Sequence, residues 1–195
     1  MKQYGKIKAI VAAVLCGCFI YSGSAIAADG PIELSGDVIE YDARTDMAKA
    51  TGGVRVTRDG GVLTGGEATY NFKTQEVTIT GGVTAVKDDM NLTADKLFST
   101  ANQEYVADGN VVAVKGENTL VGPQIRYNQA TSDISMPNGG SASGPQAEIK
   151  GDVLSGNLNT QQYHAVGNVY LNSKTNDVQS TSNEATYSGN GQDFT

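Results

Sequence analysis

The sequence predicts an all-β protein in which units of about 28 residues stack into one continuous sheet system. Beyond Ala28 no segment has a convincing helical period, and β-prone runs of four to six residues recur between glycines, asparagines and aspartates. Apolar and polar residues alternate in these runs, as they do in a half-buried strand. Two further markers, a glycine-containing pair and an aromatic residue, return at a nearly constant interval, which indicates a repeated unit.

Residues 1–27 have the form of a secretory signal peptide. A basic start with three lysines precedes an apolar run, residues 9–21, and small residues then form an A-x-A site that ends at Ala27. We expect cleavage before Ala28 and export of residues 28–195 to the periplasm as one domain. Lipidation at Cys18 and retention of the uncleaved segment as a membrane anchor are the alternatives.

Composition excludes several classes of site in the exported domain. Both cysteines precede Ala28, so a disulfide framework, a cysteine metal site and a thiol nucleophile are excluded. His164 is the single histidine, which excludes a multi-histidine metal site. Residues 28–195 keep all 21 acids but 11 of the 14 bases, and a net charge of −10 disfavours nucleic-acid binding. No nucleophile motif is present, so we expect no enzyme activity, no cofactor and no metal.

Glycine-containing pairs open the repeated strands in order along the chain. Their second residues are 29, 28, 30 and 28 positions apart, and we expect them to form tight turns with positive φ between three or four short strands per unit. Aromatics follow the same interval, with Ser155 at the position where one is missing, and Pro123, Pro137 and Pro145 predict an edge, bulge or loop nearby. The pairs are Gly52-Gly53, Gly81-Gly82, Gly109-Asn110, Gly139-Gly140 and Gly167-Asn168, and the aromatics are Tyr41, Tyr70, Phe98, Tyr127 and Tyr187.

Several phrases of the repeat resemble those of a known family. The segments 36–41, 63–70 and 92–98 resemble the "l-x-A-D-x-a-x-Y" phrase of the OstA-like family, the LptA group of lipopolysaccharide-transport proteins. Segments 107–111 and 165–169 resemble its "a-x-G-N-V" strand. The resemblance extends over nearly the whole exported domain, and it departs from the family pattern at Ser141 and Ser155.

This resemblance implies an open, bent β-jellyroll whose two facing antiparallel sheets hold a hydrophobic groove. It also implies a periplasmic bridge that carries the lipid A acyl chains of lipopolysaccharide between the inner and outer membranes. The expected partners are lipopolysaccharide, further copies of the chain joined head to tail through edge strands, and LptC-type inner-membrane and LptD-type outer-membrane proteins. Two alternatives remain: a membrane-anchored LptC-type component and a β-solenoid surface or adhesion protein.

A groove for acyl chains requires apolar side chains on one face of the sheet, and residues two apart in a strand share a face. Because the domain is acidic and lipopolysaccharide headgroups are anionic, we expect recognition through the acyl chains. Phosphates are expected in solvent or near the few bases, which are Arg55, Arg58, Lys87, Lys96 and Arg126. The predicted groove-lining residues are Ile39, Tyr41, Val54, Val56, Tyr70, Val77, Ile79, Val112, Val114, Ile125, Tyr127, Ile134 and Met136.

Overall fold

The computed structural model gives an all-β chain, as the sequence predicts. Every regular element in the described part of the chain is a strand, and no helix there is long and apolar enough to span a bilayer. The predicted signal peptide and cleavage site lie outside the described residues. Those residues are 33–58, 60–74, 76–100, 104–128, 130–145, 147–160, 162–174, 178–188 and 193–194.

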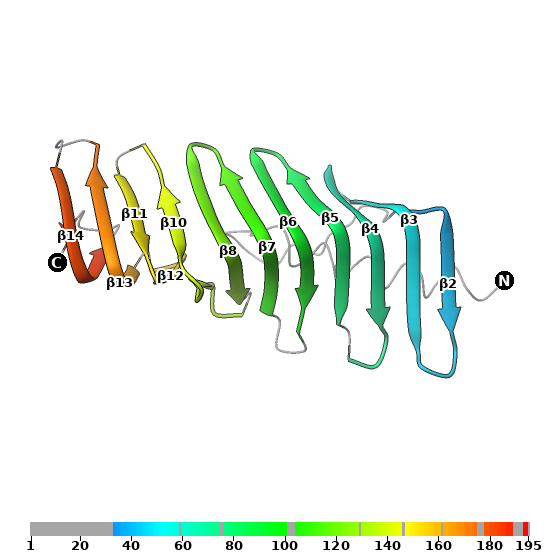
Figure 1. Cartoon of the computed structure of the whole chain (residues 1–195). Helices are drawn as coiled ribbons and strands as arrows, with labels where there is room; N and C mark the ends of the chain where they lie inside the picture. Colours follow the sequence, from blue (N-terminus) through cyan, green and yellow to red (C-terminus); the bar gives the residue numbers. More distant parts are fainter. Residues whose placement is uncertain are drawn as a thin grey trace.

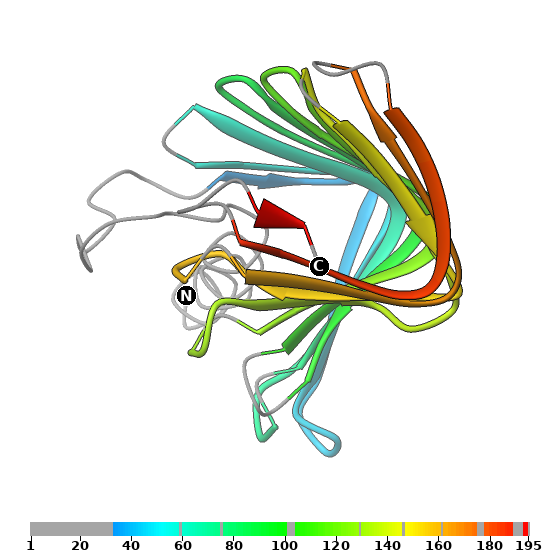
Figure 2. The ribbon, with the colours of Figure 1, turned by 90° about the vertical axis from the view of Figure 1, so that its left-hand side faces the viewer.

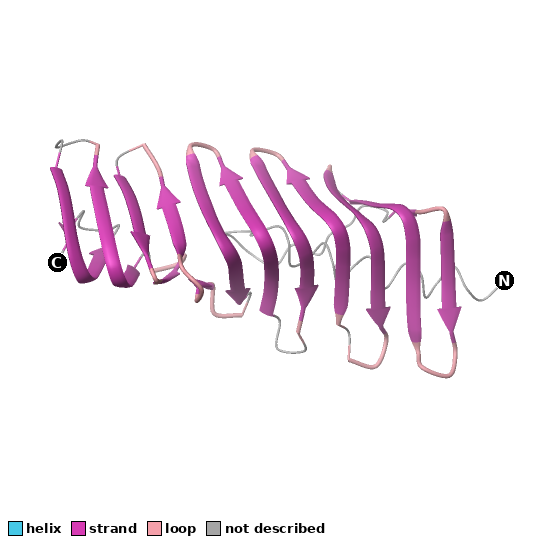
Figure 3. Ribbon diagram, in the orientation of Figure 1, coloured by secondary structure: helices cyan, strands magenta, loops and turns pink. Residues whose placement is uncertain are grey.

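The described strands form one 15-stranded antiparallel sheet in which most neighbours in space are neighbours in sequence (Figure 1, Figure 3). The first six are β1 (Glu33–Ser35), β2 (Val38–Asp42), β3 (Met47–Arg58), β4 (Gly61–Asn71), β5 (Val77–Lys87) and β6 (Met90–Ser99). The next five are β7 (Glu104–Lys115), β8 (Asn118–Asn128), β9 (Asp133–Met136), β10 (Gly140–Ser143) and β11 (Ala147–Gly151). The last four are β12 (Val153–Asn157), β13 (Gln162–Ser173), β14 (Val178–Ser188) and β15 (Asp193–Phe194).

The sheet is bent along its length into two arms that face each other, as the view along the molecule shows (Figure 2). We call the half that contains β1, β10 and β11 the leucine arm, and the half that contains β2, β9 and β12 the tyrosine arm. Each long strand crosses the bend and contributes one end to each arm. The two facing sheets implied by the resemblance are therefore two halves of one sheet, which agrees with the continuous sheet system expected from the repeat.

The bend coincides with the glycine-containing pairs. Gly109 and Asn110 both have positive φ, 78° and 50°, and the β7–β8 register shifts there between Asp108 and Val111. Equivalent shifts follow the other pairs in β3, β5 and β13. A bulge of this kind bends the strand that carries it. The structure thus differs from the expected tight turns: four of the five pairs lie inside strands of 11 or 12 residues, and Gly139-Gly140 lies at the start of β10. The length of the repeating unit stays a prediction.

Proline interrupts the regular pattern in the fourth unit. Pro137 lies between β9 and β10, so the tyrosine-arm and leucine-arm parts of this strand are separate elements. Pro123 lies in β8 opposite the bulge of β7, and Pro145 lies between β10 and β11. Because β10 pairs with both β8 and β11, the segment around Ser141 is an interior strand rather than an edge.

Candidate functional site

The inner face of the sheet carries two continuous rows of apolar side chains. Cross-strand pairing aligns each residue of a row with its neighbours on the adjacent strands. The row in the leucine arm is Leu34, Val56, Leu63, Ala85, Leu92, Ala113, Leu120, Ala142, Ile149 and Leu171. The row in the tyrosine arm is Ile39, Ala50, Ala68, Ile79, Leu97, Ala107, Ile125, Met136, Leu154, Ala165 and Ala185.

The apolar rows are buried to different extents. In the tyrosine arm, Ile79 is 1% and Leu97 is 4% exposed, so this row is packed. In the leucine arm, Leu92 and Leu120 pack against the core but remain partly exposed. Apolar surface that still meets solvent on an inward-facing row is available for contact with an apolar ligand.

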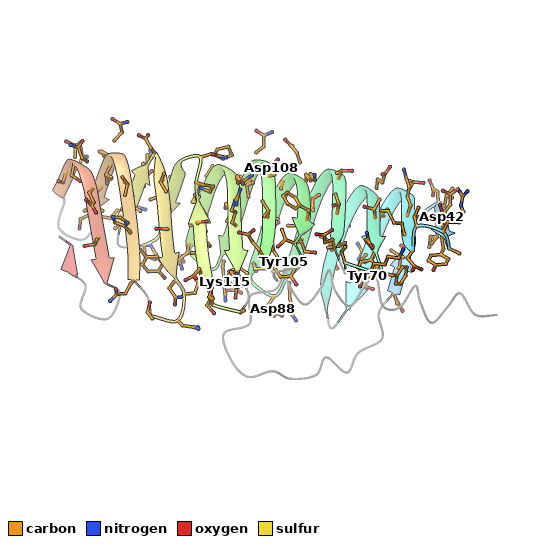
Figure 4. All side chains as sticks on the ribbon, turned by 90° about the horizontal axis from the view of Figure 1, so that it is seen from below. Asp42, Tyr70, Asp88, Tyr105, Asp108 and Lys115 are labelled. Atoms are coloured by element: carbon orange, nitrogen blue, oxygen red, sulfur yellow. The ribbon has the colours of Figure 1, made fainter. Side chains whose placement is uncertain are left out.

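A row of tyrosines lies at the free end of the tyrosine arm, and we call it the tyrosine rim. Each of its members faces inward, two positions from a residue of the apolar row, and lies next to the first or last residue of its strand. Tyr105 and Tyr127 are direct cross-strand partners. In Figure 4, Asp108 is at the bend and Tyr105 lies away from it, toward the open side. The tyrosine rim comprises Tyr41, Tyr70, Tyr105, Tyr127 and Tyr163.

Asparagine or aspartate side chains fix the turns that follow three strands of the tyrosine arm. Asn71 and Asn128 each accept two backbone N–H bonds through Oδ1, at 2.9 to 3.2 Å. Asp42 accepts the Arg44 backbone N–H at 2.9 Å, and this bond lowers the pKa of the Asp42 carboxyl. These Asx turns end the strands directly after Tyr41, Tyr70 and Tyr127, which positions the rings at the rim.

Most of the predicted groove residues share the inner face. Val54, Val56, Val77, Ile79, Ile125 and Met136 are buried in the single core cluster, and Tyr41 and Ile134 pack against it. Tyr70 is buried, Tyr127 is half-buried, and Ile39 is 39% exposed at the edge of the sheet.

Val112 and Val114 lie on the opposite, outer face of the sheet. Val112 is 36% exposed and pairs with Thr93 and Val121, whereas its neighbour Ala113 faces inward between Leu92 and Leu120. The run Val111–Val114 is apolar throughout, so alternation could not assign its faces. Because Ala113 is small, it fits between the two leucines of the neighbouring strands, and this places Val112 outward. These two valines are therefore not part of the candidate site.

The predicted bases are distributed over both faces. Lys87 occupies an inner-face position at the free end of the leucine arm, paired with Met90, and so does Lys115, which is not among the predicted bases. Arg55, Lys96 and Arg126 lie on the outer face, where Lys96 stacks 4.7 Å from the Phe98 ring centroid. The side chain of Arg58 is not described. Of the described bases expected near headgroup phosphates, Lys87 alone borders the inner face.

Sequence reasoning missed Tyr105, Tyr163 and all of the leucine row except Val56. The signal for the row was present, since Leu63, Leu92, Leu120 and Ile149 recur 29, 28 and 29 residues apart. Among the residues that the structure describes, no group of three or more histidine, cysteine, aspartate or glutamate residues is suited to hold a metal ion.

These features define a class of protein: a bent antiparallel β-sheet with one long apolar inner face. The family model described as "LptA/(LptD N-terminal domain) LPS transport protein" matches residues 64–162, slightly more than half of the chain. The chain belongs to this family of lipopolysaccharide-transport proteins, which confirms the resemblance. Because the family is one of transport proteins, the expectation that the chain is not an enzyme is also confirmed.

One solved structure that the chain resembles is LptH from Pseudomonas aeruginosa, described as the LptA-homologous periplasmic component of the conserved lipopolysaccharide transport device. The identity is 20%, the TM-score is 0.45, and the match covers 52% of this chain and 78% of LptH. No curated protein matches the chain. The family assignment rests on the match to the family model. It argues against the alternative that the chain is a β-solenoid surface or adhesion protein.

Proposed function

We propose that the protein is a periplasmic bridge that binds lipopolysaccharide and carries its lipid A acyl chains between the inner and outer membranes. The observation that supports this most directly is the inner face, where an apolar row extends along each arm. Family membership adds the substrate class, and the predicted signal peptide adds the compartment. LptC-type and LptD-type proteins are the proposed partners at the two membranes.

The acyl chains would lie against the leucine arm, where Leu92, Leu120 and Ile149 are only partly buried. Covering such side chains with a methylene chain contributes about 0.8 kcal/mol for each methylene removed from water. The exported domain carries a net charge of −10, so it repels an anionic headgroup, and the affinity must come from the tails. Lys87 and Lys115 are the inner-face bases that a phosphate at the open side would meet first.

Head-to-tail assembly is proposed from the two ends of the sheet. In the described part of the chain, β1 and β2 pair with β3 on one side, and β14 pairs with β13 and the short β15. An edge strand that offers unpaired N–H and C=O groups is a template for another strand. A second copy joined at these edges would continue both apolar rows without interruption.

A pair of adjacent substitutions tests the bound lipid. Leu120 faces inward and Val121, the next residue of β8, faces outward and is 42% exposed. We expect Leu120→Asp to weaken binding of lipid A in a fluorescent-lipid displacement assay by at least about tenfold, because a carboxylate would enter the apolar row. Val121→Asp, which adds the same charge to the other face, should leave binding within about twofold. Equal losses in the two variants would exclude the inner face as the binding surface.

A further inference from the structure

The outer face of the leucine arm carries two further rows of side chains. They flank the inward-facing leucine row, because side chains alternate between the two faces along a strand. The row nearer the bend, which we call the first outer row, is Arg55, Thr64, Thr84, Thr93, Val112, Val121, Ser141 and Lys150. The row nearer the free end, the second outer row, is Glu33, Thr57, Val62, Val86, Asn91, Val114, Thr119, Ser143 and Glu148.

The central part of both outer rows, on β4 to β8 and on β10, contains no charged residue. Val86, Val112 and Val121 are 38%, 36% and 42% exposed, so valine methyl groups meet solvent there. On the tyrosine arm, the outer face of the same strands carries charges such as Lys96 and Asp108. The two arms face each other, so the outer face of the leucine arm points away from the rest of the sheet (Figure 2). An exposed apolar patch with a polar border is typical of an interaction surface.

Charged residues occur at the ends of the two outer rows, and their signs differ between the rows. The first outer row begins with Arg55 and ends with Lys150, whereas the second begins with Glu33 and ends with Glu148. Thr57 Oγ1 donates to Glu33 Oε2 at 3.4 Å, and Lys150 Nζ lies 2.9 Å from Glu148 Oε1. Each end of the surface therefore has a cation in the first row and an anion in the second.

This charge pattern is complementary to itself. A two-fold axis parallel to the rows places the first outer row of one copy on the second outer row of another. Lys150 of each copy then faces Glu148 of the other, and Arg55 faces Thr57 and the adjoining Glu33 carboxylate. An axis parallel to the strands would instead place Arg55 on Lys150, and like charges that face each other across an interface are unfavourable.

We propose that this surface is an interface between two copies of the chain, which pack back to back through their leucine arms about a two-fold axis parallel to the outer rows. The two sheets lie about 10 Å apart with their strands aligned, as in a β-sandwich. Strands are about 4.8 Å apart, so the rows from β1 to β11 are roughly 40 Å long. Two such faces bury about 1,000 Å² in total, which is the size of a weak but specific interface.

Net charge favours this surface over others for contact between copies. Residues 28–195 carry a net charge of −10, so two copies repel each other except where they meet through uncharged side chains. The acids of the nearest turns, Asp88, Asp89 and Glu117, lie beyond the second outer row, at the free end of the arm. Both apolar inner faces stay open in the pair, so the inference goes beyond the proposed lipid-carrying function and does not depend on it.

Two single substitutions test the centre of the surface. Val112→Asp places a carboxylate among the valines and should weaken dimer formation at least about tenfold in sedimentation velocity over a concentration series. Val166→Asp is the matched control, because Val166 is 40% exposed on the outer face but lies outside both rows. It should change dimer formation by less than about twofold. Association of Val112→Asp equal to that of the wild type would overturn the proposal, and so would a wild type that stays monomeric throughout the series.

An exchange of charges tests the two-fold arrangement. In Lys150→Glu two glutamates of one copy face two of the other, and in Glu148→Lys lysines face lysines, so each variant should associate at least about fivefold more weakly than the wild type. A mixture of the two variants brings glutamate against lysine at both contacts and should restore the wild-type affinity to within about twofold. Fluorescence anisotropy of labelled Lys150→Glu protein, titrated with unlabelled Glu148→Lys protein, measures the mixed pair.

Lys49 and Glu67 supply the matched control for the exchange, because they form an exposed ion pair of the same 2.9 Å length on the outer face of the tyrosine arm. Lys49→Glu, Glu67→Lys and their mixture should all associate as the wild type does. Head-to-tail assembly through edge strands predicts no gain on mixing either pair of variants. A mixture of the Lys150→Glu and Glu148→Lys proteins that associates no better than each variant alone would therefore overturn the proposal. Thermal unfolding identifies the folded variants, and the exchange alone decides where Val112→Asp does not fold.

Discussion

At the scale of single residues, an aspartate contacts the glycine-containing pair of a neighbouring strand. Asp95 lies against Gly109 of the next strand, and its Oδ2 accepts a hydrogen bond from Asn110 Nδ2 at 2.8 Å. Asp152 has the same relation to Gly167 and Asn168, at 2.7 Å. Each of these aspartates thus requires glycine in the bulge of the neighbouring strand, which explains why glycine recurs at these positions.

This contact predicts a difference between two glycines with nearly equal φ. Gly109 (φ 78°) lies against the Asp95 carboxylate, whereas a Cβ on Gly82 (φ 76°) would meet nothing within 4 Å. Gly82→Ala should lower the free energy of unfolding by about 1 kcal/mol through backbone strain alone, and Gly109→Ala by at least about 2 kcal/mol. Urea denaturation measures both.

The added variant Asp95→Ala serves as the control. In that background the cost of Gly109→Ala should fall to that of Gly82→Ala, because the carboxylate is gone. Equal costs for the two glycines in the wild-type background would contradict the predicted clash.

Tyr70 predicts a loss of stability at high pH. Burial raises the pKa of its hydroxyl above the ordinary value of 10.0. The folded state therefore holds this proton more tightly than the unfolded state does. The resulting stability is fully present below pH 10.0 and is lost as the pH rises through the folded-state pKa. Urea denaturation of the wild type and of Tyr70→Phe, in neutral and alkaline buffer, should show the steeper loss in the wild type. Identical pH profiles would contradict the prediction.

Residues also explain how far the sequence could predict the site. Pairs such as Val77 and Ile79 were assigned to the inner face correctly, because polar residues alternate with them. Phe98 follows the aromatic interval but faces outward, and Ser99 takes the inner position next to Tyr105. The reason is that Phe98 directly follows the inward-facing Leu97, whereas Tyr70 and Tyr127 each lie two residues after an inward-facing residue. A one-residue shift exchanges the two faces, so an aromatic interval that varies between 28 and 29 residues does not by itself fix the face of the ring.

At the scale of elements, the odd- and even-numbered long strands differ at the bend, where the odd-numbered strand of a pair carries an extra residue. Between Thr51 and Val54, β3 has two residues, whereas the paired residues Gly65 and Glu67 of β4 enclose one. The extra residue on β3 has room because its bulge is made of glycines. The sequence predicts turns at these glycine pairs because a tight turn and a β-bulge both need positive φ, and the pairs alone do not distinguish the two.

The edge strand β2 (Val38–Asp42) allows a test of assembly by substitution at two neighbouring positions. Successive backbone N–H groups of a strand point to opposite sides, so either Ile39 or Glu40 directs its N–H away from β3. We expect the variants Ile39→Pro and Glu40→Pro to have different effects. One should lower Tm, and the other should keep Tm but abolish concentration-dependent self-association beyond the dimer. Light scattering over a concentration series measures the second effect. Association of the folded proline variant equal to that of the wild type would contradict assembly through β2.

At the scale of the whole molecule, charge predicts the salt dependence of binding. Residues 28–195 carry 21 acids and 11 bases, so an anionic lipid is repelled at long range. Raising the ionic strength screens this repulsion, and the affinity for lipid A should therefore increase from low to physiological salt. Titrations of a fluorescent lipid A at several salt concentrations test this sign. A decrease would indicate that phosphate contacts with bases dominate the affinity.

The leucine row has a consequence for movement along the molecule. From Leu63 to Ile149 large and small side chains alternate strictly from one strand to the next, with alanine at positions 85, 113 and 142. Strands are about 4.8 Å apart, so the pattern of one large and one small side chain repeats every ~10 Å. We expect a ligand that moves along the leucine row to advance in discrete steps of two strands, because its favoured positions are above the small alanine side chains.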